Sequence, residues 1–109
     1  MTSIKASSKR TSLTRTSDYT KQFLKDWERL NRTGRQDMIR LKETMLLLIA
    51  NDSPLGAEWQ NHNLKGEWAG FQECHIGGDF LLIYQITSAA KIESVVFVRA
   101  GSHAELFGM

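Results

Sequence analysis

The sequence has no long hydrophobic run and only one cysteine, and each scarcity excludes something. Its longest apolar run, residues 45–50, is far shorter than the roughly 20 residues that a membrane-spanning helix needs. The first 16 residues carry four basic side chains but no apolar segment, so they do not read as a secretory signal. The lone Cys74 has no partner for an internal disulfide, which indicates a reducing compartment. We therefore expect a cytoplasmic protein without membrane contact.

Basic residues concentrate in the first part of the chain, although the formal net charge is only +2. Residues 1–40 hold ten Lys or Arg against four Asp or Glu, whereas residues 41–109 hold four against eight. A basic half suits a polyanionic partner such as RNA. A solvated helix face rich in Lys and Arg is the plain alternative, and charge alone does not decide between the two.

The chain of 109 residues has room for one core. Residues 1–11 are rich in Ser, Thr and Lys and are predicted to be a disordered leader, with a single domain over residues 12–109. A first helix is expected from a cap at Ser17 or Asp18 to a stop near Gly34, because apolar residues recur there at helical spacing. That apolar stripe consists of Tyr19, Phe23, Trp27 and Leu30.

A second helix is expected from about Arg35 to Ala50, and the two helices form a hairpin with a very short turn. The apolar pattern then changes to one typical of strands, rich in aromatic and β-branched residues. The expected strands run over Trp68 to Ile76, Phe80 to Thr87 and Ile92 to Ala100, with a weak edge strand over Ser12 to Thr16. The order β-α-α-β-β-β predicts an α+β fold in which a helical hairpin packs on one face of an antiparallel sheet.

All three histidines lie in the second half, at the ends of expected strands. A short loop brings His75 and Asp79 to the same end of the sheet, His103 follows the last strand, and His62 precedes the three consecutive strands. Histidine takes and gives a proton near neutral pH, so this arrangement predicts one patch for acid–base chemistry or for a metal ion. The chain has no HExxH helix, no paired-cysteine motif and no glycine-rich phosphate loop.

The spacing of these motifs resembles the YafQ branch of the RelE/ParE toxin superfamily, the toxin halves of bacterial toxin–antitoxin pairs. Nearly half of the chain carries the resemblance closely, and the C-terminal motif is its most specific part. The matching segments are His62-Asn63-Leu64-Lys65-Gly66, Glu73-Cys74-His75-Ile76, Asp79-Phe80, Leu82-Ile83-Tyr84 and Arg99-Ala100-Gly101-Ser102-His103-Ala104-Glu105-Leu106-Phe107.

The resemblance implies a RelE-like fold and a ribosome-dependent mRNA endonuclease that needs no metal or other cofactor. The ribose 2′-OH attacks the adjacent phosphate, which requires a base, an acid and donors for the developing charge. By resemblance, the catalytic positions are His62, His75, Asp79 and His103. We expect His62 or Asp79 to act as the base and His103 to act as the acid or to contact phosphate. The resemblance also implies a cognate antitoxin, the ribosome and mRNA as partners, and operator DNA bound through the antitoxin.

Candidate RNA contacts are Lys65, Phe80, Arg99 and Phe107. Two positions depart from the family pattern, because many relatives have Trp at Phe80 and a basic residue at Gln72. The first departure weakens base stacking, and the second places more weight on Lys65, Arg99 and the basic first half as phosphate donors.

Each candidate also has a plainer interpretation. His62 as a loop cap, His75 as a strand histidine bonded to a carbonyl, Asp79 as a turn former and Phe107 as a plug on the core are all ordinary roles. Arg99 pairs with a carboxylate such as Glu73 or Glu93 in the plainer case, and Cys74 is expected to be buried and inert.

Three other functions stay open. The first is a ParE-like toxin that poisons a protein such as gyrase, although ParE-type domains lack this set of histidines. The second is a small metal-binding protein that uses His62, His75, His103 and Asp79 as ligands. The third is a decayed toxin that serves only as a DNA-binding co-repressor together with its antitoxin.

Overall fold

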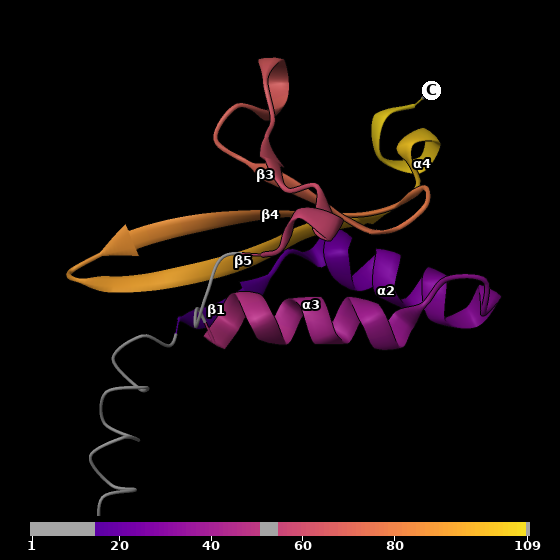
Figure 1. Ribbon diagram of the computed structural model, residues 1–109, viewed down its shortest axis with the longest axis horizontal. Coiled ribbons are helices and arrows are strands. Elements are labelled where there is room, and N and C mark those ends of the chain that lie inside the picture. Colours follow the sequence, from indigo (N-terminus) through magenta and orange to yellow (C-terminus); the bar gives the residue numbers. More distant parts are fainter. Residues whose placement is uncertain (1–14, 51–54, 109) are drawn as a thin grey trace, which may run out of the picture.

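The computed structural model describes residues 15–50 and 55–108, and these form one sheet with helices on both faces (Figure 1). The leader predicted over residues 1–11 lies outside the described residues. The elements in chain order are β1 Thr16–Tyr19, α2 Lys21–Thr33, α3 Met38–Ala50, β2 His62–Asn63, β3 Gln72–Gly77, β4 Phe80–Ala89, β5 Ile92–Gly101 and α4 His103–Phe107. Short 3₁₀ turns at Ala57–Trp59 and Gly66–Trp68 flank β2.

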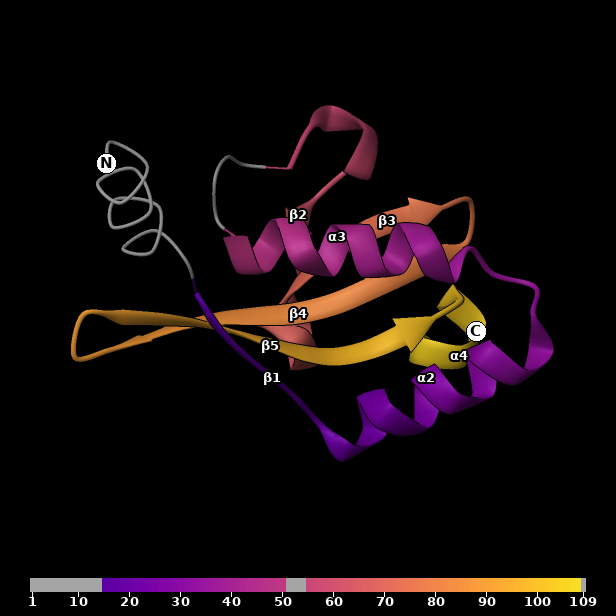
Figure 2. The same ribbon diagram turned by 90° about the horizontal axis from the view of Figure 1, so that it is seen from below.

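The five strands lie in the order β1-β5-β4-β3-β2. Strands β3, β4 and β5 pair antiparallel, as the sequence predicts. The short β2, which the sequence did not predict, adds to β3 antiparallel, and β1 adds to β5 in parallel. Helices α2 and α3 lie on one side of the sheet and α4 lies on the other (Figure 1). The tip of the long β4–β5 hairpin projects beyond the helices (Figure 2).

Each face of the sheet has its own apolar core. On the helical face, side chains of β3, β4 and β5 pack against Phe23, Leu30, Leu41 and Leu48 of the two long helices. On the other face, Leu81 and Ile83 pack against Leu106 of α4, with partly buried Trp68 and Phe107 beside them. Because β4 is covered on both faces, its residues 80–84 are all buried, and no polar–apolar alternation marks them in the sequence.

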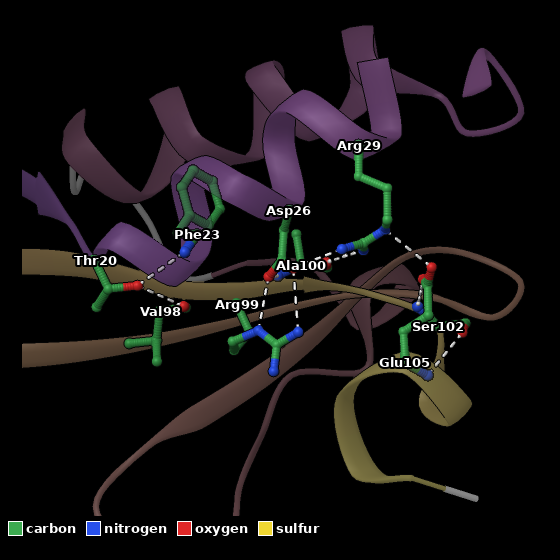
Figure 3. A network of polar contacts seen from close by, with 9 residues as sticks. All are labelled: Thr20, Phe23, Asp26, Arg29, Val98, Arg99, Ala100, Ser102 and Glu105. Carbon is green, nitrogen blue, oxygen red and sulfur yellow. Dashed lines mark hydrogen bonds and ion pairs between the residues drawn. The ribbon is translucent and has the colours of Figure 1, made fainter. Parts of the chain in front are cut away.

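The start of the chain differs from the sequence prediction. The first strand is Thr16–Tyr19 rather than Ser12 to Thr16, and residues 12–14 lie outside the described residues. The cap of α2 is Thr20, not Ser17 or Asp18. Its Oγ1 accepts a hydrogen bond from Phe23 N at 3.0 Å and donates one to the Val98 carbonyl of β5 at 2.8 Å (Figure 3). This bond to β5 keeps the chain extended up to Tyr19, which therefore lies in β1 and not in the helical stripe.

The other boundaries are close to their predicted positions. Helix α2 ends at Gly34, whose φ of 65° is the left-handed conformation that glycine adopts without strain. Helix α3 begins at Met38 rather than Arg35, because Asp37 accepts the backbone N–H of Arg40 at 2.9 Å and so caps the helix. Strand β3 begins four residues later than predicted, since Trp68 ends a 3₁₀ turn. None of the helices in the described part of the chain is long and apolar enough to cross a membrane.

Candidate active site

The three histidines form a row at one end of the sheet. His62 lies in β2, His75 in the neighbouring strand β3, and His103 is the first residue of α4. The ring centroids of His62 and His75 lie 6.3 Å apart, and those of His75 and His103 lie 6.2 Å apart. The structure therefore brings together, at one partly exposed edge, three proton-transfer groups that are far apart in the sequence.

Asp79 holds His103 at one end of the row. One carboxylate oxygen, Oδ1, accepts the backbone N–H of His103 at 3.0 Å and also contacts Nδ1 of its ring. The backbone and side-chain hydrogen bonds from His103 lower the pKa of Asp79, so this carboxyl group stays ionised at neutral pH. An ionised Asp79 favours the proton on Nδ1 of His103, which leaves Nε2 for proton exchange with a ligand.

Glu73 lies at the other end of the row. From the sequence it was a candidate partner for Arg99 and not a candidate site residue. Its side chain is buried, at 3% exposure of the residue, although it is a carboxylate. One oxygen, Oε1, lies 3.4 Å from Nε2 of His62 and 3.7 Å from Nε2 of His75. The ligand atoms of these three residues lie within 4.8 Å of one another, so they form a set that fits a metal ion. Glu73 and His75 are two residues apart in one strand, so their side chains lie on the same face of the sheet. This spacing could have indicated Glu73 as a site residue from the sequence.

His62 is oriented by the backbone. Its Nδ1 lies 3.0 Å from the carbonyl oxygen of Gln60, which is the second residue before it. Since a carbonyl only accepts, this contact favours a proton on Nδ1 and turns Nε2 toward Glu73. His75 turns its Nε2 toward the same carboxylate of Glu73.

Phe107 is partly exposed beside His103, and Lys65 is exposed two residues after β2. The ring of Phe107 lies 6.1 Å from that of His103 and packs edge-on against Trp68 at 5.9 Å. Leu106, beside it, is buried in the core at 6% exposure, so Leu106 rather than Phe107 is the plug on the core. Lys65 is exposed in the short connection after β2.

Two predicted RNA contacts have a different environment from the one expected. Phe80 is only 1% exposed and packs in the core under the helices, so its ring has no free face for a base, and we remove it from the candidate contacts. Arg99 binds Asp26 of α2 with two hydrogen bonds, at 2.7 and 3.1 Å (Figure 3). Its partner is therefore neither Glu73 nor Glu93, and contact of Arg99 with RNA stays a prediction.

Cys74 faces the core under the helices. Burial raises the pKa of its thiol to about 12, and the charge of neighbouring Glu73 adds to the shift. The thiol therefore stays protonated at neutral pH, and its residue has no exposed surface. This confirms that Cys74 is a buried packing residue.

Comparison with known proteins identifies the group to which the chain belongs. A family model described as the bacterial toxin of type II toxin–antitoxin system, YafQ, matches residues 15–108. The chain belongs to the YafQ toxin family. The "mRNA interferase toxin YafQ" of Escherichia coli K12 is 40% identical over 91 residues, which cover 84% of this chain and 94% of that protein.

Solved structures of YafQ-family and related toxins match over nearly their whole length. The E. coli DinJ–YafQ toxin–antitoxin complex contains a chain 38% identical to this one, with a TM-score of 0.77, covering 87% of this chain and 99% of that chain. A metal-bound toxin from Helicobacter pylori is 38% identical, with a TM-score of 0.74 and coverage of 85% and 99%. These matches confirm both the resemblance drawn from the motifs and the predicted α+β fold of RelE type.

Proposed function

We propose that this YafQ-family toxin is an endoribonuclease that cleaves mRNA on the ribosome by acid–base catalysis without a metal ion. The observation that carries the proposal is the row of His62, His75 and His103 at one edge, with an acidic partner at each end. The name of the E. coli relative, an mRNA interferase, supports the substrate class. His62, His75 and His103 are the proposed catalytic groups, with Glu73 beside the first two and Asp79 as the residue that orients His103.

The proposed reaction divides the proton transfers between the two ends of the row. The ribose 2′-OH attacks the adjacent phosphorus, the bond from phosphorus to the 5′-oxygen breaks, and the products are a 2′,3′-cyclic phosphate and a 5′-hydroxyl. The cluster of His62, Glu73 and His75 takes the 2′-OH proton. A His103 ring that carries protons on both nitrogens, with Nδ1–H held by Asp79, gives its Nε2 proton to the leaving 5′-oxygen. Attacking and leaving oxygens lie on opposite sides of the phosphorus, so acid and base belong on opposite sides of it as well.

Asp79 has a different role in this proposal from the base considered first. Its Oδ1 is occupied by the backbone and ring of His103, so it orients the acid rather than taking the 2′-OH proton. Lys65 and the half-buried ring of Phe107 are the proposed contacts to phosphate and to a base. The exposed cations of the helical hairpin suit ribosomal RNA, and these are Lys21, Lys25, Arg32, Arg35 and Lys42.

A small acidic antitoxin is the proposed partner, because the first part of the chain is basic and E. coli YafQ forms a complex with DinJ. The complex is proposed to bind operator DNA through the antitoxin. Expression of the chain alone should stop growth, and co-expression of the neighbouring reading frame should restore it. Growth that is unaffected by the chain alone argues against the toxin activity.

The direct test is cleavage of a defined mRNA by the purified chain, with and without programmed ribosomes. We expect cleavage only with ribosomes, with a 2′,3′-cyclic phosphate end, and at the same rate when the chain has first been stripped of metal ions with EDTA and separated from the chelator. An mRNA with 2′-deoxyribose at the cleaved position should resist cleavage, whereas one with 2′-deoxyribose elsewhere should not. Cleavage of the deoxy position at an equal rate overturns the proposed attack by the 2′-OH.

Metal binding is a second candidate function, favoured by the set His62, Glu73 and His75. Two imidazoles and a carboxylate are ligands that Zn²⁺ accepts. A bound ion occupies the same lone pairs that the proposed base needs, so the two functions exclude each other at one site. Titration with Zn²⁺ at constant Mg²⁺ separates them, with chain that has been treated with EDTA and then separated from it. Loss of activity on this treatment and recovery with Zn²⁺ support the metal, whereas inhibition by Zn²⁺ supports the metal-free reaction.

A further inference from the structure

The helix that carries His103 is too short to hold its own position. Helix α4 has five residues, and a helix of that length does not form in water without tertiary contacts. Asp79 fixes its first residue from the β3–β4 turn, and Leu106 is buried against the sheet. A third support comes from α2, on the other side of the molecule's sheet, through a network of charged side chains (Figure 3).

Glu105 joins this network to the helix start. Its Oε1 accepts the backbone N–H of Ser102 at 2.8 Å, while the Ser102 hydroxyl accepts the N–H of Glu105 at 3.1 Å. This reciprocal pair is a capping box, and it fixes the turn immediately before His103. The other carboxylate oxygen, Oε2, forms an ion pair with Nε of Arg29 at 3.1 Å.

Arg29 connects three elements with one guanidinium group. Besides its ion pair with Glu105 of α4, it donates hydrogen bonds to Asp26 Oδ1 in its own helix at 2.8 Å and to the Ala100 carbonyl of β5 at 3.3 Å. Asp26 is fully buried and accepts the N–H of Ala100 as well as two bonds from Arg99. The guanidinium of Arg29 is therefore held from two sides, with its Nε at the Glu105 carboxylate.

Gly101 provides the space for this contact. A Cβ atom at this position would lie 2.8 Å from Oε1 of Glu105 and 3.1 Å from Nη2 of Arg29. The first distance is closer than packed atoms adopt and the second is tight, and the backbone φ of 157° disfavours other residues too. The residues of the C-terminal motif therefore act together to fix α4. Arg99 binds Asp26, Gly101 leaves room for the ion pair of Arg29 and Glu105, and Ser102 with Glu105 caps the helix.

We infer that Arg29 and Glu105 are positioning residues for cleavage: their ion pair sets the place of α4, and with it the ring of His103 relative to the histidine row. This inference rests on the proposed function and extends it to residues that do not touch the RNA. The pair itself is partly exposed, with side chains 32% and 38% accessible, so its contribution to global stability is small. Its effect should therefore appear in the rate of cleavage and not in the melting temperature.

Glu105→Gln is the variant that isolates the ion pair. A glutamine oxygen still accepts the Ser102 N–H, so the capping box is kept, but the charge opposite Arg29 is lost. A misplacement of about 1 Å in a catalytic group costs up to about 100-fold in rate, so we expect kcat on programmed ribosomes to fall about 10- to 100-fold with KM unchanged. The matched control is Glu28→Gln, the same change at an exposed position of α2, and it should leave kcat unchanged.

The second variant is Arg29→Gln, alone and combined with Glu105→Gln. Arg29→Gln also removes the bonds of Arg29 to Asp26 and Ala100, whereas Glu105→Gln breaks only the ion pair that the two variants share. The double variant should therefore be no slower than Arg29→Gln alone. Equal kcat for Glu105→Gln and Glu28→Gln overturns the inference. A rate that falls only in step with the melting temperature also overturns it, because that result shows a structural role without specific positioning.

Amide hydrogen exchange tests the same inference without relying on nuclease activity. The N–H groups of Leu106 and Gly108 donate to Ser102 and Ala104 carbonyls, both at 2.9 Å, and report on α4. In Glu105→Gln these two amides should exchange faster, while those of the β4–β5 pair should not change. If the native chain cleaves no mRNA, the proposed function fails. Unchanged exchange at these two amides in Glu105→Gln is a separate result, and it overturns the inference that the ion pair of Arg29 and Glu105 positions α4.

Discussion

Substitution of Asp26 is expected to destabilise the protein strongly, although this residue lies far from the histidine row in the sequence. Its carboxylate is fully buried and accepts four hydrogen bonds, two from Arg99, one from Arg29 and one from the Ala100 backbone. Removing one partner of a buried ion pair costs about 3–5 kcal/mol. Because both guanidinium groups are partly exposed and regain water, we expect the lower end, about 3 kcal/mol, for Asp26→Ala.

Asp26→Asn is the sharper variant because it keeps the shape of the side chain. One amide oxygen remains to accept, but the amide nitrogen is a donor that faces other donors. Urea unfolding followed by tryptophan fluorescence measures the free energy of unfolding, and Glu28→Gln serves as the exposed control, expected within about 0.5 kcal/mol of the native chain. A loss below about 1 kcal/mol for Asp26→Asn refutes the argument, because it shows that the guanidinium groups need no buried carboxylate.

The pH dependence gives an independent check of the same network. Burial alone raises the pKa of Asp26, but the hydrogen bonds from Arg99, Arg29 and Ala100 outweigh it, so the pKa lies below its ordinary value. A carboxyl group with a lowered folded pKa contributes its full stability above its unfolded pKa of about 3.9 and loses it as pH falls through the folded value. The difference in unfolding free energy between native and Asp26→Asn should therefore be constant from about pH 5 to 8 and shrink below about pH 4. A difference that grows on acidification contradicts this sign.

The sequence predicted the elements whose signals are local. The helix stop at Gly34, the α3 helix and the two antiparallel hairpins follow from apolar period and turn residues, and all are present. Strand β1 was misplaced because its four residues are all exposed and carry no alternation. Its position depends on parallel pairing with β5, which lies more than 70 residues later in the chain, and no local pattern encodes that pairing.

In the candidate site, too, the sequence indicated which residues take part but not the environments that only tertiary packing creates. The motif spacing indicated the three histidines and Asp79, and the structure brings them to one edge. Phe80 was assigned to RNA by resemblance, because many relatives have Trp at this position, yet in this structure it packs in the core under the helices. The plainer interpretation of Arg99, a pair with a carboxylate, is confirmed, but the partner is Asp26 and not one of the carboxylates named from the sequence. Asp26 is 73 residues away, and only the packing of α2 on β5 brings the two together.

The remaining predictions concern the site itself. His103→Ala, His75→Ala and Asp79→Ala should each lower ribosome-dependent cleavage by about 10²–10⁴ with melting temperatures near native, and parallel loss of both would reduce these residues to structural roles. Cleavage should persist when the chain has been treated with EDTA and separated from it before the assay, and loss of activity on this treatment would favour the metal-binding function. The last prediction separates two neighbours on α4. Leu106→Ala removes a buried side chain and should cost about 2–5 kcal/mol. Phe107→Ala removes a half-buried ring whose edge-on contact with Trp68 is worth only about 0.5–1.5 kcal/mol beyond its buried area. Compared with Leu106→Ala, it should lower the free energy of unfolding less and the rate of cleavage more. Equal losses of stability in the two variants would show that Phe107 also belongs to the core, and its proposed stacking on RNA would then have no support.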